Sequence, residues 1–207
     1  MRSRQYLVLQ RDITEPLTAS AAPSAVSFRA ATVADINTRV AAGLGYGDDW
    51  KRDAANSVAG GNSCVIGEAD GRAVYTGWLS FDAVAVPPRS FLLGPGWAYF
   101  HDVRAAEPYD TPEVRFAGLS YRMHLAAERG ARNGLNLVYA GDTVGLHAMQ
   151  EAGFVVTGDI KRSRILRHWW WDRYPDGFEQ HLLQGCAAET IAAVKAAGGY
   201  GHRLAHG

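Results

Sequence analysis

The sequence Trp97-Ala-Tyr-Phe-His-Asp-Val103, followed by Thr111-Pro-Glu-Val-Arg-Phe-Ala-Gly-Leu-Ser120, decides the fold of this chain. The first run is aromatic and β-branched, which is typical of a strand. In the second run, Thr111 can cap a helix and Pro112 suits its first turn, so we expect a long helix that ends near Gly130. Helix N-terminal amides favour negative charge, and Arg115 adds a forked donor suited to phosphate. The stretch therefore predicts a strand, a turn and a helix that can bind a diphosphate.

The segments after this region predict two more pairs of elements. Residues 135–140 are apolar and strand-like, a short helix follows them, and Gly153-Phe154 ends that helix. Two further strands are expected over residues 155–160 and 164–171, with a turn near Lys161.

The segments before it predict strands, short helices and a hairpin. Strands are expected near residues 5–13 and 26–31. Thr32 and Asp35 match a capping box, and a second short helix is expected over residues 50–58, so that the pair forms either a flap beside a cleft or an ordinary helical hairpin. Asp70-Gly71 between two strand-like runs predicts a β-hairpin. Residues 82–96 contain three prolines and two glycines, which predicts a loop.

The composition limits the class of protein. The chain has 207 residues, of which 47% are hydrophobic, enough for one domain with a substantial core. The formal net charge is zero, which argues against nucleic acid or an anionic membrane as the main partner. No apolar run approaches the length of a membrane span or a signal sequence, so we expect a soluble cytoplasmic protein. Cys64 and Cys186 lie far apart without metal-ligand spacing, so we predict neither a disulfide scaffold nor a metal site.

The order of the expected elements resembles that of the GNAT superfamily of acyl-CoA-dependent N-acyltransferases. The family motif R/Q-x-x-G-x-G/A, at the start of its central helix, is matched by Arg115-Phe-Ala-Gly118-Leu-Ser120, just after Pro-Glu. The downstream pattern of the family, which ends in Gly-Phe after a short helix, is matched from Asp142 to Phe154. The resemblance covers about residues 26–168. It implies an α+β fold with a mixed, mostly antiparallel sheet flanked by helices.

The resemblance also implies where acetyl-CoA, or another acyl-CoA, binds as co-substrate. Its pantetheine arm would lie between the strands that begin near Trp97 and Leu135, which splay apart in the family. Its diphosphate would lie on the amides of residues 116–120. The cofactor-binding residues expected on this basis are Val103, Arg115, Phe116, Ala117, Gly118, Leu119, Ser120 and Asp142.

Several residues depart from the family pattern. Asp142 stands where an asparagine usually contacts the cofactor, and Met149 stands where many members have a tyrosine general acid. Phe116 and Ala117 make the motif less open and less positive. These departures leave a second possibility open. The protein would then be a GNAT-like module that binds acyl-CoA or has a regulatory role and has lost catalysis.

Acyl transfer to an amine requires a base or a water chain for the amine proton, and N–H donors for the oxyanion. The candidate bases are His101, Asp102 and Glu107. Strand alternation places His101 and Asp102 on opposite faces, so we do not expect both in one cleft. Glu107 lies at the exit of the strand, where family bases are often found, and we prefer it. Each of the three can instead be a solvated charge or an ion-pair partner.

The acceptor site is expected from residues 43–61, 82–96 and 168–174, with Trp50, Tyr99 and Trp170 as substrate-binding residues. The cluster His168-Trp-Trp-Trp171 can also cover the core or form a homodimer face. We expect acyl transfer to the amine of a small molecule by direct attack in a ternary complex. The tryptophan-rich end leaves open a long-chain acyl group or an acyl carrier protein as donor.

We expect three segments along the chain. Residues 1–25 form an N-terminal strand and linker, residues 26–171 form the GNAT-like domain, and residues 172–207 form a C-terminal helical extension.

Overall fold

The computed structural model describes residues 2–17, 26–36, 44, 48–86, 89–165 and 168–173. In these parts of the chain the strands are β1 (Arg2–Asp12), β2 (Ser27–Ala30), β3 (Ser63–Ala69), β4 (Arg72–Ser80), β5 (Ala83–Val86), β6 (Arg89–Leu92), β7 (Trp97–Ala105), β8 (Asn133–Tyr139), β9 (Val155–Ile165) and β10 (His168–Arg173). The helices are α1 (Val33–Asp35), α3 (Asp48–Ala59), α4 (Pro112–Glu128) and α5 (Thr143–Glu151).

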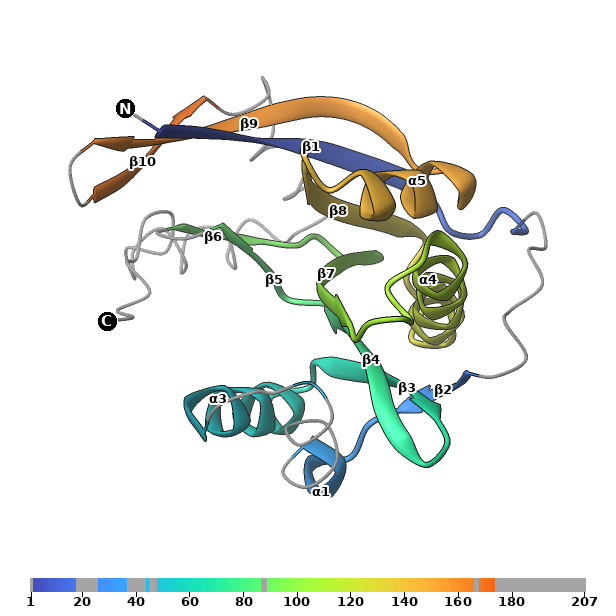
Figure 1. Cartoon of the computed structure of the whole chain (residues 1–207). Helices are drawn as coiled ribbons and strands as arrows, with labels where there is room; N and C mark the ends of the chain where they lie inside the picture. Colours follow the sequence, from blue (N-terminus) through green and yellow to red (C-terminus); the bar gives the residue numbers. More distant parts are fainter. Residues whose placement is uncertain are drawn as a thin grey trace.

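One large sheet organises the described residues, in the strand order β10-β9-β1-β8-β7-β4-β3-β2 (Figure 1). Every neighbouring pair in it is antiparallel except β7 and β8, which are parallel. The expected α+β fold with a mixed, mostly antiparallel sheet is confirmed.

Short sequence signals start several of these elements as expected. Asp70 and Gly71 both have positive φ, 49° and 73°, as the two-residue turn between β3 and β4 requires. Thr32 and Asp35 form a reciprocal capping box at the start of α1. The Thr111 side chain accepts from the Val114 amide, and Pro112 occupies the first turn of α4.

The N-terminal strand lies inside the sheet rather than beside it. β1 pairs with β8 on one side and with β9 on the other. Val8 packs in the cluster that contains Trp97 and Leu135, while Leu9 packs in the cluster that contains Phe116. The uniformly apolar run at residues 6–9 fits a strand that is covered on both faces. The expected separation of residues 1–25 from the rest therefore does not apply to residues 2–12.

Two local expectations are wrong. Residues 82–96 contain the hairpin β5–β6, whose residues 83–86 pair with residues 89–92. Val84 and Phe91 pack on Tyr99 and Leu135, so burial of alternating apolar residues outweighs the loop-forming prolines nearby. The second error concerns the turn near Lys161, because β9 continues through that residue to Ile165.

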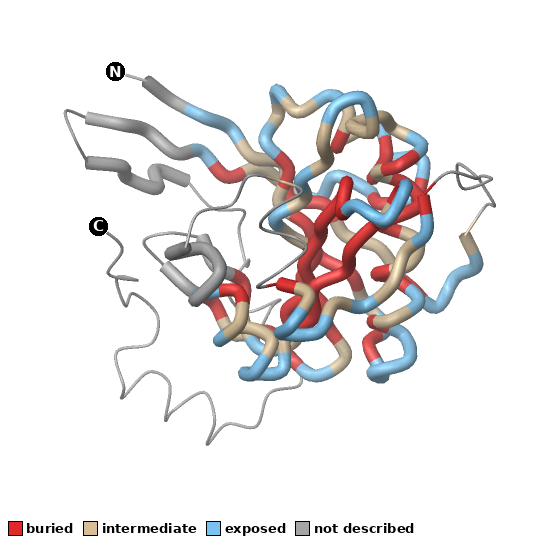
Figure 2. Tube along the Cα trace, turned by 60° about the horizontal axis from the view of Figure 1, so that its bottom comes forward, coloured by how far each residue is buried: buried red, intermediate tan, exposed pale blue. Residues whose placement is uncertain are grey.

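Helices and the β5–β6 hairpin cover the two faces of the sheet. α4 and α5 lie together on one face, where Phe116, Leu119 and Met149 meet Phe100 of the sheet. On the other face, Ile36 after α1 and residues of α3 pack on Cys64 and Trp78, and the β5–β6 hairpin covers the part around β7 and β8. Buried residues gather in the central strands between these layers (Figure 2).

Several expectations fall outside the described residues. These are most of the linker, the first helix beyond Ile36, and the C-terminal extension apart from the last residues of β10. No helix in the described parts is long and apolar enough to cross a membrane.

We predict that Gly118→Ala destabilises the protein, although alanine is the better helix former. A Cβ at residue 118 would lie 2.4 Å from Cζ of Tyr75, whose ring is fully buried between α4 and the sheet. Chemical denaturation should show a loss of about 1–3 kcal/mol, the usual cost of overpacking. Tyr75→Leu in the same chain should recover part of this loss in a double-mutant cycle. Additive effects of the two substitutions would contradict the proposed packing.

Candidate active site

A β-bulge separates β7 from β8. In the pairing of β4 with β7, Thr76 is opposite Arg104 and Trp78 is opposite His101, so Gly77 faces two residues, Asp102 and Val103. Asp102 has φ of 44°, a conformation that costs a non-glycine residue free energy and is common at functional sites. The parallel pairing of β7 with β8 ends one residue earlier, at Phe100 and Asn136. Beyond that point the two strands diverge, as the resemblance implies.

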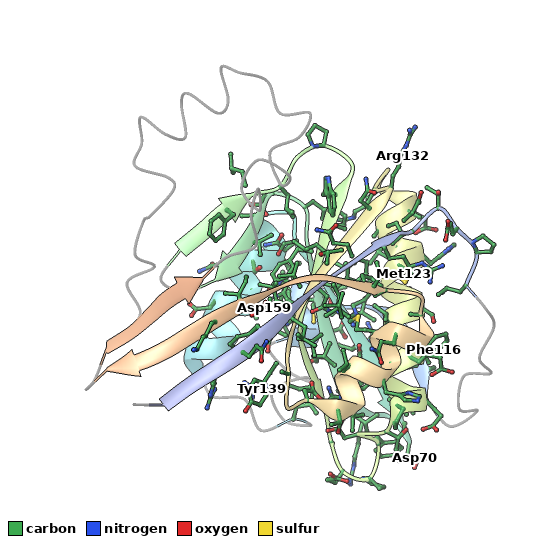
Figure 3. All side chains as sticks on the ribbon, turned by 90° about the horizontal axis from the view of Figure 1, so that it is seen from above. Asp70, Phe116, Met123, Arg132, Tyr139 and Asp159 are labelled. Atoms are coloured by element: carbon green, nitrogen blue, oxygen red, sulfur yellow. The ribbon has the colours of Figure 1, made fainter. Side chains whose placement is uncertain are left out.

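A cleft of about 100 Å³ lies between the diverging strands. α4 and α5 both begin at this side of the sheet, and Tyr139 lies at the end of β8 (Figure 3). The cleft is lined by His101, Asp102, Val103, Arg115, Arg122, Asn136, Leu137, Val138, Tyr139, Asp142, Gly145, Ala148 and Met149. It thus brings together five residues that the sequence predicts for the cofactor or for catalysis, together with others that it does not predict.

The predicted diphosphate loop is instead the interior of α4. Because the helix begins at Pro112, the amides of residues 116–120 donate hydrogen bonds within the helix and are not free for an anion. Phe116, Ala117 and Leu119 are buried in the core, and Gly118 packs on Tyr75. The Ser120 hydroxyl donates to the carbonyl of Phe116 at 2.9 Å. The expectation that these five residues bind cofactor through their amides is therefore wrong, since the helix starts earlier than the motif implies.

Arg115 connects the starts of α4 and α5. Its guanidinium donates to both carboxylate oxygens of Asp110, at 2.6 and 3.1 Å, and to Oδ2 of Asp142 at 2.7 Å. Burial lowers the pKa of Arg115, but the hydrogen bonds to these two carboxylates outweigh burial and raise the pKa. Asp142 also caps α5, because its Oδ1 accepts from the Gly145 amide at 2.9 Å. Arg115 therefore lines the cleft with its charge already balanced by two carboxylates, and its role in cofactor binding stays a prediction.

His101 is a neutral side chain at the inner end of the cleft. Its Nε2 lies 2.9 Å from the Ser80 hydroxyl, and its ring stacks on Tyr99 at 4.8 Å. Burial, and secondarily the charge of Arg122, lower the pKa of His101 to about 3. The imidazole is therefore uncharged at neutral pH and can exchange hydrogen bonds with Ser80.

Asp102 lines the same cleft as His101, contrary to the expectation from strand alternation. The reason is the bulge, which turns Asp102 out of the alternating pattern. Burial, followed by the charge of Asp102, raises the pKa of the Cys64 thiol to about 12. Cys64 belongs to the face away from α4, which is also the face of Tyr99. His101 pairs with Trp78, which packs with Cys64, so His101 approaches the cleft from that face.

Of the other predicted residues, Glu107 and Tyr99 do not line the cleft. Glu107, the preferred base, is exposed in the turn after β7 and does not line it. Tyr99 is 6% exposed and packs in the core under the β5–β6 hairpin. Trp50 belongs to α3, and Trp170 belongs to β10, which β9 and β1 separate from β8. The predicted role of Glu107 as a base stays a prediction. The predicted roles of Tyr99, Trp50 and Trp170 in acceptor binding also stay predictions.

Asn136 and Arg122 also line the cleft but were not predicted as ligand contacts. Asn136 marks the end of the β7–β8 pairing, and its side-chain amide donates to Sδ of Met149 at 3.4 Å. Arg122 is 1% exposed and donates to the carbonyls of Trp78 and Gly118 at 3.3 and 3.4 Å. The sequence does contain a signal for Arg122. Residues at four-residue spacing share one face of a helix, and Arg122 is the one charged residue in such a row, formed by Val114, Gly118, Arg122 and Ala126.

Solved structures resemble this chain over most of its length. An acetyltransferase of the GNAT family from Colwellia psychrerythraea superposes with a TM-score of 0.58 at 12% identity, covering 83% of this chain and 57% of that chain. A GCN5-related N-acetyltransferase from Sphaerobacter thermophilus gives 0.54 at 16% identity, covering 75% and 49%. AAC(6')-Iy, in complex with the bisubstrate analogue CoA-S-monomethyl-acetylneamine, gives 0.53 at 13% identity, covering 73% and 99%.

The chain has the GNAT fold. Identities this low establish the architecture and not the activity. This chain also spans only about half to three fifths of the length of the first structures that it matches. No protein-family model and no curated protein matches the sequence.

We predict that His101 makes the protein sensitive to mild acid. Its pKa is about 3 in the folded state and about 6.5 when exposed, so the unfolded chain binds more protons between these values. The free energy of unfolding has its full value above pH 6.5. It decreases as the pH falls below 6.5, with a limiting slope of about 1.4 kcal/mol per pH unit. Urea unfolding at pH 6.5, 5.5 and 4.5 should show this fall in the wild type and a weaker one in His101→Asn. Equal slopes in the two proteins would contradict a buried neutral His101.

We predict that Asp110→Asn raises the affinity for CoA about two- to fivefold, as expected for one partly screened charge. The substitution removes one of the two carboxylates that balance Arg115. Isothermal titration with CoA at low salt measures the change. Asp70→Asn, in the distant β3–β4 turn, is the matched control and should leave the affinity unchanged. Unchanged or weaker binding by Asp110→Asn would show that the diphosphate lies elsewhere.

Proposed function

We propose that the protein is an N-acyltransferase that moves an acetyl or other acyl group from acyl-CoA to the amine of a small molecule. The observation that carries the proposal is the cleft between β7 and β8, which opens beside the starts of α4 and α5 and holds a carboxylate and an imidazole at its inner end. The GNAT fold and the CoA analogue bound to AAC(6')-Iy support an acyl-CoA as the co-substrate.

The pantetheine arm fits the space between the strands. Residues 101–103 of β7 and 137–139 of β8 line the cleft past the end of their mutual pairing, so their backbone edges there can hydrogen-bond to the amides of an extended arm. The diphosphate end would lie at the mouth, beside Arg115 and the starts of the two helices. Because Asp110 and Asp142 already pair with Arg115, this end contributes less to affinity than a free arginine would.

The reaction is direct attack in a ternary complex. The neutral amine attacks the thioester carbonyl, the C–N bond forms, the C–S bond breaks, and the CoA thiolate leaves. Asp102 accepts the amine proton, since it is a carboxylate that lines the cleft and is partly exposed there. His101, which is held by its hydrogen bond with Ser80, orients the amine. Met149 cannot donate a proton, so the CoA thiolate takes its proton from water.

A second candidate is a module that binds acyl-CoA without catalysis. The pairing of Arg115 with two carboxylates and the methionine at the position of the family tyrosine favour it. This protein would bind acyl-CoA in the same cleft but release no CoA with any amine.

The two candidates are separated by measuring free thiol released from acyl-CoA in the presence of a panel of small amines. The acyltransferase proposal expects amine-dependent release, with kcat lowered by about a hundredfold in Asp102→Asn, the usual contribution of a general base. Glu107→Gln, outside the cleft, is the control and should retain wild-type turnover. Binding of acyl-CoA without release with any amine would favour the binding module. Absence of binding would contradict both.

A further inference from the structure

Arg122 is a buried cation at the closed end of the cleft. It lies seven residues after Arg115 on α4, so it is about 10 Å deeper along the helix axis than the mouth. Its guanidinium lies near the Phe100 ring, 5.6 Å from the centroid, where the pairing of β7 with β8 ends. Any ligand that enters past the helix starts therefore reaches Arg122 with its innermost atoms.

Two glycines make the space for this side chain. A Cβ at Gly77 would lie 2.9 Å from Nε of Arg122 and 2.8 Å from the Tyr75 hydroxyl. Gly118, one turn before Arg122, is equally close to Tyr75. The arginine and the tyrosine hydroxyl thus lie side by side in a place that only small neighbours permit, and Gly77 is the residue opposite the bulge that opens the cleft.

Among the described residues, no carboxylate balances the charge of Arg122, in contrast to Arg115, which has two. Its hydrogen bonds go to two backbone carbonyls at 3.3 and 3.4 Å, which leaves further N–H donors of the guanidinium. The neighbouring Tyr75 hydroxyl has no hydrogen-bond partner other than Arg122 among the described residues. A buried guanidinium of this kind is best satisfied by an anion from a ligand.

We propose that Arg122 binds the terminal carboxylate of a short dicarboxylic acyl group, so that the preferred donor is a malonyl- or succinyl-type acyl-CoA. This inference rests on the proposed acyl-CoA site. An acetyl group would leave the guanidinium without a partner, whereas an acyl chain that ends in a carboxylate brings a forked acceptor that matches it. The donor is favoured over a carboxylated acceptor as the source, because Arg122 lies on the α4 face and the proposed acceptor face is the opposite one.

Calorimetric titration of the full chain with succinyl-CoA and butyryl-CoA tests the inference, because these acyl groups have equal length and differ in the terminal charge. Succinyl-CoA should bind at least about tenfold tighter, the gain expected from one charge-assisted pair. Arg122→Gln should reduce succinyl-CoA to the affinity of butyryl-CoA and leave butyryl-CoA unchanged. Arg72→Gln, an exposed arginine at the β3–β4 turn, is the control and should change neither.

The outcomes separate this inference from the proposed function. Equal wild-type binding of the two acyl-CoAs would overturn the role of Arg122 and leave the acyl-CoA site standing. Absence of binding by both would overturn the acyl-CoA site itself and the inference with it. An Arg122-dependent preference for amines that carry a carboxylate, with equal donor affinities, would assign the arginine to the acceptor and overturn the donor proposal. If Arg122→Gln does not fold, the wild-type comparison decides alone.

Discussion

The candidate site depends on one backbone irregularity, the bulge at Asp102 and Val103 opposite Gly77. A regular β7 would keep its parallel pairing with β8 and close the sheet, and no ligand could pass between the strands. The extra residue bends β7 away after Phe100, and it also turns Asp102 toward the face that carries His101. The same feature therefore opens the cleft and places two polar groups beside it.

The two arginines of the cleft differ in whether carboxylates pair with them. At the mouth, Asp110, Arg115 and Asp142 form a compensated network that ties α4 to α5. At the closed end, Arg122 is buried among two backbone carbonyl oxygens, the Phe100 ring and the Tyr75 hydroxyl. The protein therefore holds its uncompensated positive charge where an acyl group would end, and not where a diphosphate would lie.

Much of the fold could be predicted from local signals. The Asp70-Gly71 turn, the Thr32 and Thr111 caps, and the element order that resembles the GNAT superfamily are all present as expected. The insertion of β1 between β8 and β9 could not be predicted, because pairing between strands far apart in sequence leaves no local pattern. The β5–β6 hairpin was missed because its prolines suggested a loop, whereas burial of Val84 and Phe91 decided the structure.

The site was predicted less well than the fold. Val103, Arg115, Asp142, His101 and Asp102 do line the cleft. The motif at residues 116–120 matched the family in letters, but here the helix starts earlier and its amides are already bonded. Alternation failed at Asp102 because a bulge shifts the face of every following residue. Arg122 was overlooked because the sequence alone does not show whether a buried arginine has a carboxylate partner.

The central claim is that acyl-CoA lies between β7 and β8. Hydrogen–deuterium exchange of the full chain with and without acetyl-CoA tests it most directly, because the backbone edges of the two strands are unpaired with each other there. The account predicts slower exchange confined to residues 101–103 and 137–139 when acetyl-CoA is bound. Unchanged exchange in these segments at saturating acetyl-CoA, or protection only elsewhere in the chain, would contradict it.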